Sequence, residues 1–230
     1  IDPQAKATYL FEATPHLPRQ LYKLEQQAKD FALSGVFLTH AHIGHYAGLM
    51  FFGHESMGAS NVPVFAMPRM MDYLGTNGPW SQLVAYNNIA LRPLAHNRTE
   101  NLSGLGVTPF LVPHRDEFSE TVGYSIQGPN KTALFIPDIN KWSVWERDIA
   151  EVIKTVDYAL LDATFFGAGE LPFLKKTVLN IFSKDFFKKR IILLYGENQD
   201  LINDLNQQLV SKLIEEEKIS KSFFEEDIIK

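Results

Sequence analysis

Three histidines that directly follow a short apolar run place the strongest constraint on how this chain folds. Val36-Phe-Leu38 is typical of a buried strand, and Thr39-His-Ala-His-Ile-Gly-His45 follows it before Gly48-Leu49-Met50 resumes an apolar, helical pattern. α/β proteins place their chemistry at strand ends, and imidazole is the commonest metal-binding side chain. Histidines at i, i+2 and i+5 converge on one or two divalent ions where the backbone turns tightly between them. The stretch therefore predicts a metal site at the end of a strand.

Two further predicted apolar strands are each followed by a residue of a type that binds metals. The stretch from Leu105 to Val112 predicts a strand that leads to His114, and the stretch from Thr132 to Ile136 predicts one that leads to Asp138. Any one of these strand ends could be accidental. If they meet at one sheet edge with the histidine loop, however, they bring His40, His114 and Asp138 together around a metal ion.

Other polar residues fit non-metal roles better. His16 lies in a strand-breaking loop, His54 on a predicted helix surface and His96 in a polar turn. Asp162 ends a predicted strand, where a capping or loop hydrogen bond and a place beside the metal are equally good interpretations.

The rest of the sequence alternates strands with helices, which predicts an α/β fold. Strands are expected at residues 8–12, 36–38, 62–67, 89–91, 105–112, 124–126, 132–136, 158–161 and 190–195, with a hairpin turn at 128–131. Helices are expected from residue 20, at 48–57, 68–74, 146–153, 177–187 and 201–214. A length of 230 residues, of which 45% are hydrophobic, suits one domain over residues 1–230.

Charge and hydropathy limit the kinds of binding partner that the chain can have. A net charge of −5, with acidic clusters at 215–217 and 225–227, argues against nucleic acid as a partner. No apolar run approaches the ~18 residues of a membrane span. The expected partner is a small-molecule substrate, and the pattern indicates no particular oligomeric state. The chain opens at Ile1 without an initiator Met, so any targeting segment would precede residue 1 and the localisation is unknown.

Several motifs carry a family resemblance. Thr39-His-Ala-His-Ile-Gly-His45 resembles the T-H-x-H-x-D-H signature of the metallo-β-lactamase superfamily. Val112-Pro-His-Arg-Asp-Glu-Phe-Ser-Glu-Thr-Val-Gly-Tyr124 and Phe135-Ile-Pro-Asp-Ile-Asn-Lys-Trp142 are similar to the pyrroloquinoline-quinone biosynthesis protein B (PqqB)-like branch. The resemblance implies an αββα sandwich of the metallo-β-lactamase type that lacks some N-terminal strands. It also implies that His114 is the third metal-binding histidine and that Asp138 bridges the metals.

The sequence departs from the family pattern at four places. Gly44 stands where the family has an Asp of the second metal site, and Asn140 replaces a common carboxylate. After the last predicted strand, where the family places a final histidine, the chain has no histidine, and Glu197 or Asp200 is an alternative oxygen ligand beside the simpler interpretation of a solvated turn. A loop with a further histidine, expected after Leu171-Pro172, is also missing.

These observations predict a metal-dependent hydrolase with one metal ion, or one tight and one weak. The expected ligands are His40, His42 and His114 with Asp138 as the fourth or bridging ligand, and the expected metal is zinc, with iron and manganese as alternatives. Asp138 and His45 are the expected catalytic residues, with His45 orienting the attacking water or hydrogen-bonding a carboxylate. A PqqB-like, iron-dependent, oxygen-using enzyme and a non-catalytic binding protein on the same scaffold remain the alternatives.

Overall fold

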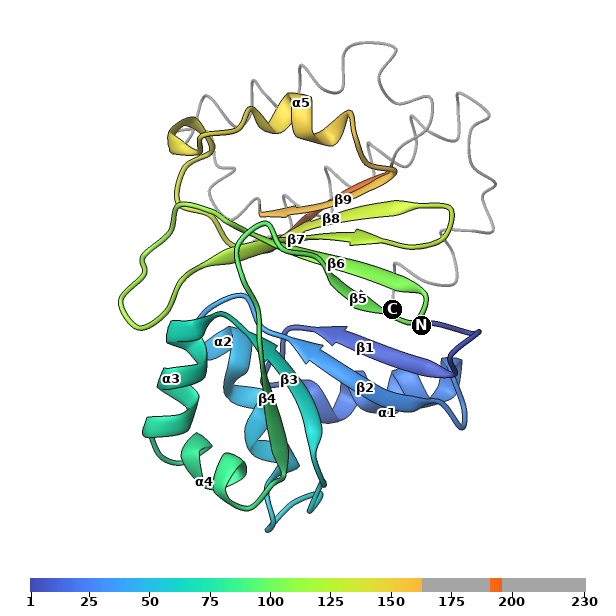
Figure 1. Ribbon diagram of the computed structural model, residues 1–230, viewed down its shortest axis with the longest axis vertical. Coiled ribbons are helices and arrows are strands. Elements are labelled where there is room, and N and C mark those ends of the chain that lie inside the picture. Colours follow the sequence, from blue (N-terminus) through green and yellow to red (C-terminus); the bar gives the residue numbers. More distant parts are fainter. Residues whose placement is uncertain (163–190, 196–230) are drawn as a thin grey trace. The chain divides into compact units, whose positions relative to one another are not determined.

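The computed structural model describes residues 1–162 and the backbone of residues 191–195 (Figure 1). The chain divides into two compact units, Ile1–Pro129 and Asn130–Lys230. Strands β1 to β7 belong to the first unit, and strands β8 to β10 belong to the second. The expectation of one domain over residues 1–230 stays a prediction.

Four parallel strands form the first sheet of the first unit, in the order β1-β2-β3-β4. They are β1 (Ala7–Phe11), β2 (Ala32–Phe37), β3 (Val62–Ala66) and β4 (Ile89–Pro93). The connecting helices are α1 (Leu17–Gln27), α2 (Ile43–Tyr46), the 3-10 helix η1 (Ala47–Phe52), α3 (Pro68–Thr76) and α4 (Trp80–Ala85). Because β1 and β2 run in the same direction and end in register at Phe11 and Phe37, the residues that follow them emerge at one edge of the sheet.

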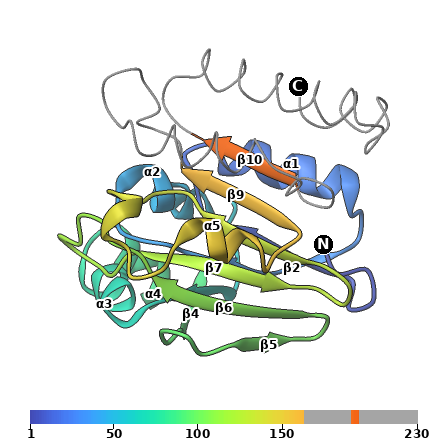
Figure 2. The same cartoon turned by 90° about the horizontal axis from the view of Figure 1, so that it is seen from above.

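A second sheet in the same unit contains three antiparallel strands (Figure 2). They are β5 (Glu100–Leu102), β6 (Leu105–Leu111) and β7 (Val122–Gln127). The loop from β6 to β7 carries His114 and returns beside the loop after β2, where the Val122 backbone amide donates to the Thr39 carbonyl over 3.2 Å. The two histidine-bearing loops of the sequence are therefore neighbours.

Helices cover one face of the first sheet through a continuous apolar core. Its members from the helices include Leu17, Leu49, Met70, Leu74 and Leu83, which pack with Val36, Leu38, Val64, Ala66 and Ile89 of the strands and their ends. Each fully buried leucine of this kind stabilises the fold by roughly 1.5–3 kcal/mol relative to an exposed one. Gly48 allows η1 to approach this closely, because a Cβ there would lie 2.1 Å from the Thr14 carbonyl oxygen.

Aromatic side chains fill the opposite face of the first sheet. The Phe37 ring stacks on Phe65 with centroids 4.4 Å apart and on Phe11 at 5.0 Å, and Tyr124 of β7 meets it edge-on at 5.8 Å. Successive residues of β2 thus point to opposite faces, toward the helices and toward the second sheet. Helices, first sheet and second sheet form three successive layers of the first unit.

The described part of the second unit has three parallel strands. They are β8 (Thr132–Ile136), β9 (Tyr158–Asp162) and β10 (Ile191–Tyr195), with the 3-10 helix η2 (Trp142–Val144) and α5 (Ile149–Ile153) between β8 and β9. Figure 2 shows β9 beside β10. Asp148 caps α5 by accepting the Ala150 amide over 2.8 Å, as its position before the helix favours. None of the helices in the described part of the chain has the length and apolar character needed to cross a membrane.

The α/β class with two sheets is confirmed, and each strand predicted from the sequence is present within a few residues. Residues 50–57 were predicted as helix, which is wrong beyond Phe52, because the chain turns there on hydrogen bonds such as that from Gly58 N to Gly53 O at 2.9 Å. Helix α4 and strand β5 were not predicted, since both are short and lie beside turn residues. The helices expected at 177–187 and 201–214 lie outside the described residues.

Candidate metal centre

The loop between β2 and α2 presents two histidines to one side of the first unit. His40 is buried, with 1% of its surface exposed, and His42 is partly buried. Ser119, from the loop after β6, accepts the Ala41 amide at its Oγ over 2.8 Å. The Tyr124 hydroxyl donates to the Leu38 carbonyl just before the loop. The second sheet and its loops therefore fix the backbone that carries both imidazoles.

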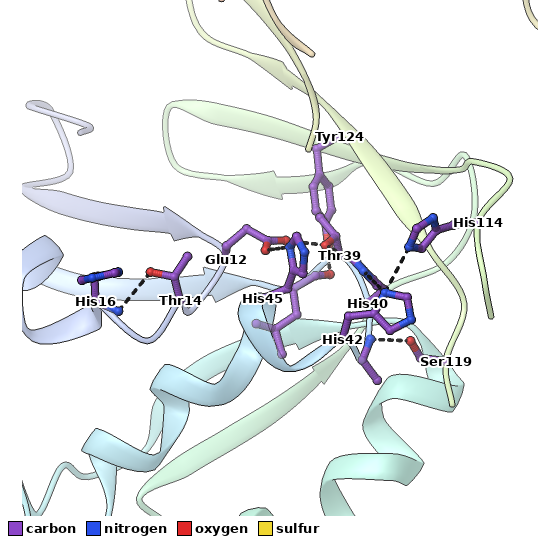
Figure 3. Close-up of polar contacts among 12 residues, drawn as sticks. Glu12, Thr14, His16, Thr39, His40, His42, His45, His114, Ser119 and Tyr124 are labelled. Atoms are coloured by element: carbon purple, nitrogen blue, oxygen red, sulfur yellow. Dashed lines mark hydrogen bonds and ion pairs between the residues drawn. The ribbon is translucent and has the colours of Figure 1, made fainter. Parts of the chain in front are cut away.

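The ring nitrogens of three histidines converge (Figure 3). Nδ1 of His42 lies 2.9 Å from Nε2 of His40 and 3.0 Å from Nε2 of His114. Each ring offers one ligand atom, and these atoms all lie within 4.8 Å of one another. The residues predicted from the strand ends of the first unit thus meet at one point.

Hydrogen bonding assigns the tautomer of His40. Thr39 Oγ1 donates its single proton to the carboxylate of Glu12, and it lies 2.9 Å from Nδ1 of His40. With that proton committed, the hydroxyl oxygen can only accept, so His40 donates from Nδ1. The lone pair of the neutral His40 ring is therefore on Nε2, the atom that faces His42.

A second carboxylate assigns the tautomer of His42. Glu117 Oε2 lies 2.9 Å from Nε2 of His42, so this nitrogen carries the proton that the carboxylate accepts. This hydrogen bond lowers the pKa of the Glu117 carboxyl, which keeps the acceptor ionised near neutral pH. The neutral His42 ring is left with its lone pair on Nδ1, toward the other two imidazoles.

This arrangement of donors fits a bound cation. The lone pairs of His40 Nε2 and His42 Nδ1 face each other at 2.9 Å, where two acceptors repel unless a positive charge lies between or beside them. Divalent zinc accepts nitrogen ligands at about 2.0–2.1 Å and is held in catalytic sites by three protein ligands and an open position. A carboxylate on the distal nitrogen of a ligating histidine, as Glu117 provides for His42, is a usual feature of such sites.

His45 lies beside the three rings but has a different partner. Its ring centroid is 4.2 Å from that of His40, and its Nδ1 pairs with Oε2 of Glu12. Of the two roles expected for His45, a hydrogen bond to a carboxylate is therefore the one the structure contains. Gly44, where the resemblance places an Asp, has open space around it, because a Cβ there would meet nothing within 4 Å.

The second unit contains the two aspartates named from the sequence. Asp138 follows β8 and is partly buried. Asp162, at the end of β9, is 5% exposed, and its Oδ2 accepts the Ile139 amide over 3.1 Å. One interpretation of Asp162 was a loop hydrogen bond, and this bond is present. It joins Asp162 to Ile139, the residue that follows Asp138. Glu197 and Asp200 lie outside the described residues.

The remaining histidines do not join the cluster. His16 is exposed at the start of α1, and His54 is exposed near the ring of Tyr86 at 6.2 Å. His96 Nδ1 accepts the Leu111 amide over 3.0 Å, which ties the turn after β4 to the end of β6. These placements match the loop and surface roles predicted for them, except that His54 lies in a turn instead of on a helix.

Sequence reasoning missed two carboxylates of the site, Glu12 and Glu117. Glu12 directly follows β1, and the strand-end pattern that singled out His40, His114 and Asp138 applies to it equally. Glu117 had no such signal, because it lies in the middle of an irregular loop and reaches His42 only through the fold.

Comparison with known proteins shows the family to which the chain belongs. The family model described as "Beta-lactamase superfamily domain" matches residues 7–181. Zinc-bound PqqB from Methylobacterium extorquens is similar to this chain in structure, with a TM-score of 0.58 and 23% identity over 71% of this chain and 58% of that one. A search of the curated proteins finds none that matches.

Two further solved structures are similar to this chain in fold. Unliganded yeast PDE1 has a TM-score of 0.53 and 11% identity, covering 89% of this chain and 72% of that one. The short form of human tRNase Z has a TM-score of 0.53 and 11% identity, covering 84% and 86%. At these identities the likeness shows the fold alone.

Proposed function

Because the chain belongs to the metallo-β-lactamase superfamily, we propose that it is a metal-dependent hydrolase of a small-molecule substrate. The observation that carries the proposal is the convergence of ring nitrogens from His40, His42 and His114, with lone pairs assigned toward one point for the first two. A cluster that only stabilised the fold would have no reason to direct acceptors at one another.

The proposed site holds one zinc ion through these three histidines, with Asp138 as the fourth ligand. Three neutral imidazoles suit zinc, and a carboxylate at the fourth or bridging position completes a site that stays open to water. The bound metal would lower the pKa of a coordinated water toward about 7, which supplies hydroxide at neutral pH. The chain's own residues orient the ligands: Glu117 acts on His42, and Thr39 acts on His40.

His45 and Asp138 are the proposed catalytic residues. His45 pairs with Glu12 through Nδ1, so Nε2 is the basic nitrogen of the neutral ring and is suited to exchange a proton with the reacting water. Asp138, as a carboxylate beside the metal, would accept a hydrogen bond from that water and orient it.

A second candidate is an oxygen-using reaction at iron. Histidines combined with a carboxylate also suit Fe(II), and manganese accepts the same kinds of ligand. The similarity in fold to PqqB keeps this candidate open. It differs from hydrolysis in metal identity and in the consumption of oxygen, so one set of measurements separates the two.

Elemental analysis of the protein purified without added metal, combined with turnover assays, tests the proposal. Stoichiometric zinc with turnover of a carboxylic ester or phosphodiester supports it, and both must be lost in a His42→Ala variant but kept in His96→Ala. Iron with oxygen consumption would instead support the second candidate. A chain without stoichiometric metal would refute both and leave a non-catalytic binding protein.

A further inference from the structure

One buried carboxylate touches both sides of the histidine loop. Glu12 follows β1, is only 4% exposed, and is anchored by its backbone amide, which donates to the Phe37 carbonyl over 2.8 Å. Its Oε1 accepts the Thr39 hydroxyl, and its Oε2 pairs with Nδ1 of His45 (Figure 3). A charged group this deeply buried persists only when hydrogen bonds replace the lost water, and these two contacts do so.

The backbone at Glu12 is also unusual. Its φ is +79°, in a region that residues other than glycine and asparagine rarely adopt. A conformation of this kind is retained where the side chain or the surrounding structure requires it, and such outliers cluster at functional sites. At this position the rare backbone conformation coincides with a buried carboxylate that makes two hydrogen bonds.

The two contacts of Glu12 control protons on two different rings. The Thr39 proton points to Glu12, so the hydroxyl oxygen accepts Nδ1–H of His40, over 2.9 Å. The same carboxylate accepts Nδ1–H of His45 directly. Because a carboxylate only accepts, both rings are forced to carry their proton on Nδ1 and to keep Nε2 as the basic nitrogen.

We propose that Glu12 is a positioning residue that sets His40 and His45 together in the tautomer with a basic Nε2. The role rests on the proposed function, since the purpose of this tautomer is to present Nε2 of His40 to a metal and Nε2 of His45 to the reaction. Glu12 is not one of the residues proposed to hold the metal. It acts through Thr39 on one ring and through its own hydrogen bond on the other.

Replacing Glu12 by Gln reverses one of the two contacts without changing the size of the side chain. The amide has one oxygen that accepts and one nitrogen that donates, so one partner must now accept a proton from it. If that partner is Thr39, its proton turns to His40 and shifts the His40 proton to Nε2. If it is His45, the His45 proton shifts to Nε2. Either result blocks one of the nitrogens that the wild type keeps basic.

Nitrogen-15 NMR of the metal-free protein at a pH of about 8, where an ordinary histidine is neutral, reads the tautomers directly. In the wild type we expect His40 and His45 as Nδ1–H rings, and in E12Q one of the two as an Nε2–H ring, with zinc affinity lowered about 10–100-fold. Wild-type tautomers for both rings in folded E12Q would overturn the proposal.

Variants at Thr39 provide the matched test if E12Q does not fold. Thr39→Val removes the relay to His40 but leaves the Glu12 contact with His45, so only His40 should lose its fixed tautomer. Thr39→Ser keeps the hydroxyl and should restore it. An unchanged His40 in T39V would overturn the proposal. The tautomers are measured without metal. If the wild type binds no zinc, the proposed zinc site is refuted, but the tautomer measurements still test the role of Glu12.

Discussion

The Ala41 backbone amide donates to Oγ of Ser119 over 2.8 Å, and this hydrogen bond joins the two loops that carry the three clustered histidines. Ala41 stands between His40 and His42, and Ser119 lies five residues after His114. Ser119 is 2% exposed, so water does not replace it when it is removed. The relative position of the three imidazoles is therefore held in part by this serine hydroxyl, beside the hydrogen bonds from the Val122 amide and the Tyr124 hydroxyl.

Ser119→Ala should destabilise the protein and weaken metal binding together. The unsatisfied Ala41 amide costs about 1–3 kcal/mol in the free energy of unfolding, and the loosened loops lower the metal affinity. Denaturant unfolding and metal titration measure the two effects. Ser34→Ala is the control, because the Ser34 hydroxyl donates locally, over 3.3 Å, to the carbonyl of Ala32 two residues away. Equal behaviour of both variants would contradict the proposed coupling.

Alanine substitution of each proposed imidazole ligand should remove most of the bound metal. A three-histidine set that loses one member retains too few nitrogen ligands for tight zinc. The expected losses are in His40→Ala, His42→Ala and His114→Ala, measured by elemental analysis after dialysis. His16→Ala, His54→Ala and His96→Ala should keep the wild-type content. Full metal content in the first three would reject the site, and loss in any of the last three would identify a misplaced ligand.

The outcome at individual residues shows what the sequence could predict. The strand-end rule found His40 and His114 because an apolar run followed by a ligand type is visible in the chain itself. It could equally have found Glu12, which follows β1. The contact of Glu117 with His42 was not predictable, because 75 residues separate them and only the packing of two loops brings them together.

Prediction from the local sequence pattern was also wrong where tertiary contacts determine the backbone conformation. The sequence predicted a helix over 48–57, yet the structure has the 3-10 helix η1, which ends at Phe52 and which Gly48 allows to press against the backbone of Thr14. Thr14 lies 34 residues before Gly48, and nothing in the sequence indicates that the two will approach so closely. Short elements such as β5 depend on their neighbours in the sheet, so their own residues carry little signal.

Two buried tyrosines should resist ionisation at alkaline pH. Burial, and second the nearby charge of Glu12, raise the pKa of Tyr124 well above its ordinary value. Burial and the Tyr73 hydroxyl, 2.8 Å away, raise that of Tyr46. Because the folded pKa exceeds the unfolded value of about 10, the stability that these groups contribute is complete below pH 10 and is lost as the pH rises toward the folded pKa.

Alkaline titration of the tyrosinate absorbance measures this resistance. We expect a late phase that coincides with unfolding, and its amplitude should fall by about one tyrosine in Tyr124→Phe. Replacement of the exposed Tyr22, with 63% of its surface accessible, should leave the late phase unchanged. A late phase of unchanged size in the Tyr124 variant would show that this hydroxyl titrates with the exposed groups.

The ligands that this chain offers limit the number of metal ions it can hold tightly. Two-metal hydrolases hold their ions about 3.5–4 Å apart with a separate set of ligands for each. In this chain Gly44 offers no side chain to a second ion, which leaves His45 and Asp138, and two protein ligands are usually too few for tight zinc. We therefore expect one tightly bound ion, or one tight and one weak, by calorimetric titration.

Gly44→Asp tests this reasoning by adding the carboxylate that the family pattern contains. A Cβ at this position meets nothing within 4 Å, so the backbone there has room for a side chain to begin. Gly44 lies in the first turn of α2, where an acidic side chain is favourable and glycine is a poorer helix former than aspartate, so the variant should fold at least as well as the wild type. We expect the second ion to bind more tightly in G44D, while Gly44→Ala, the matched control, stays as the wild type. Two ions of similar affinity in the wild type would refute the one-metal proposal and direct the search for ligands to Asp162 and Glu197.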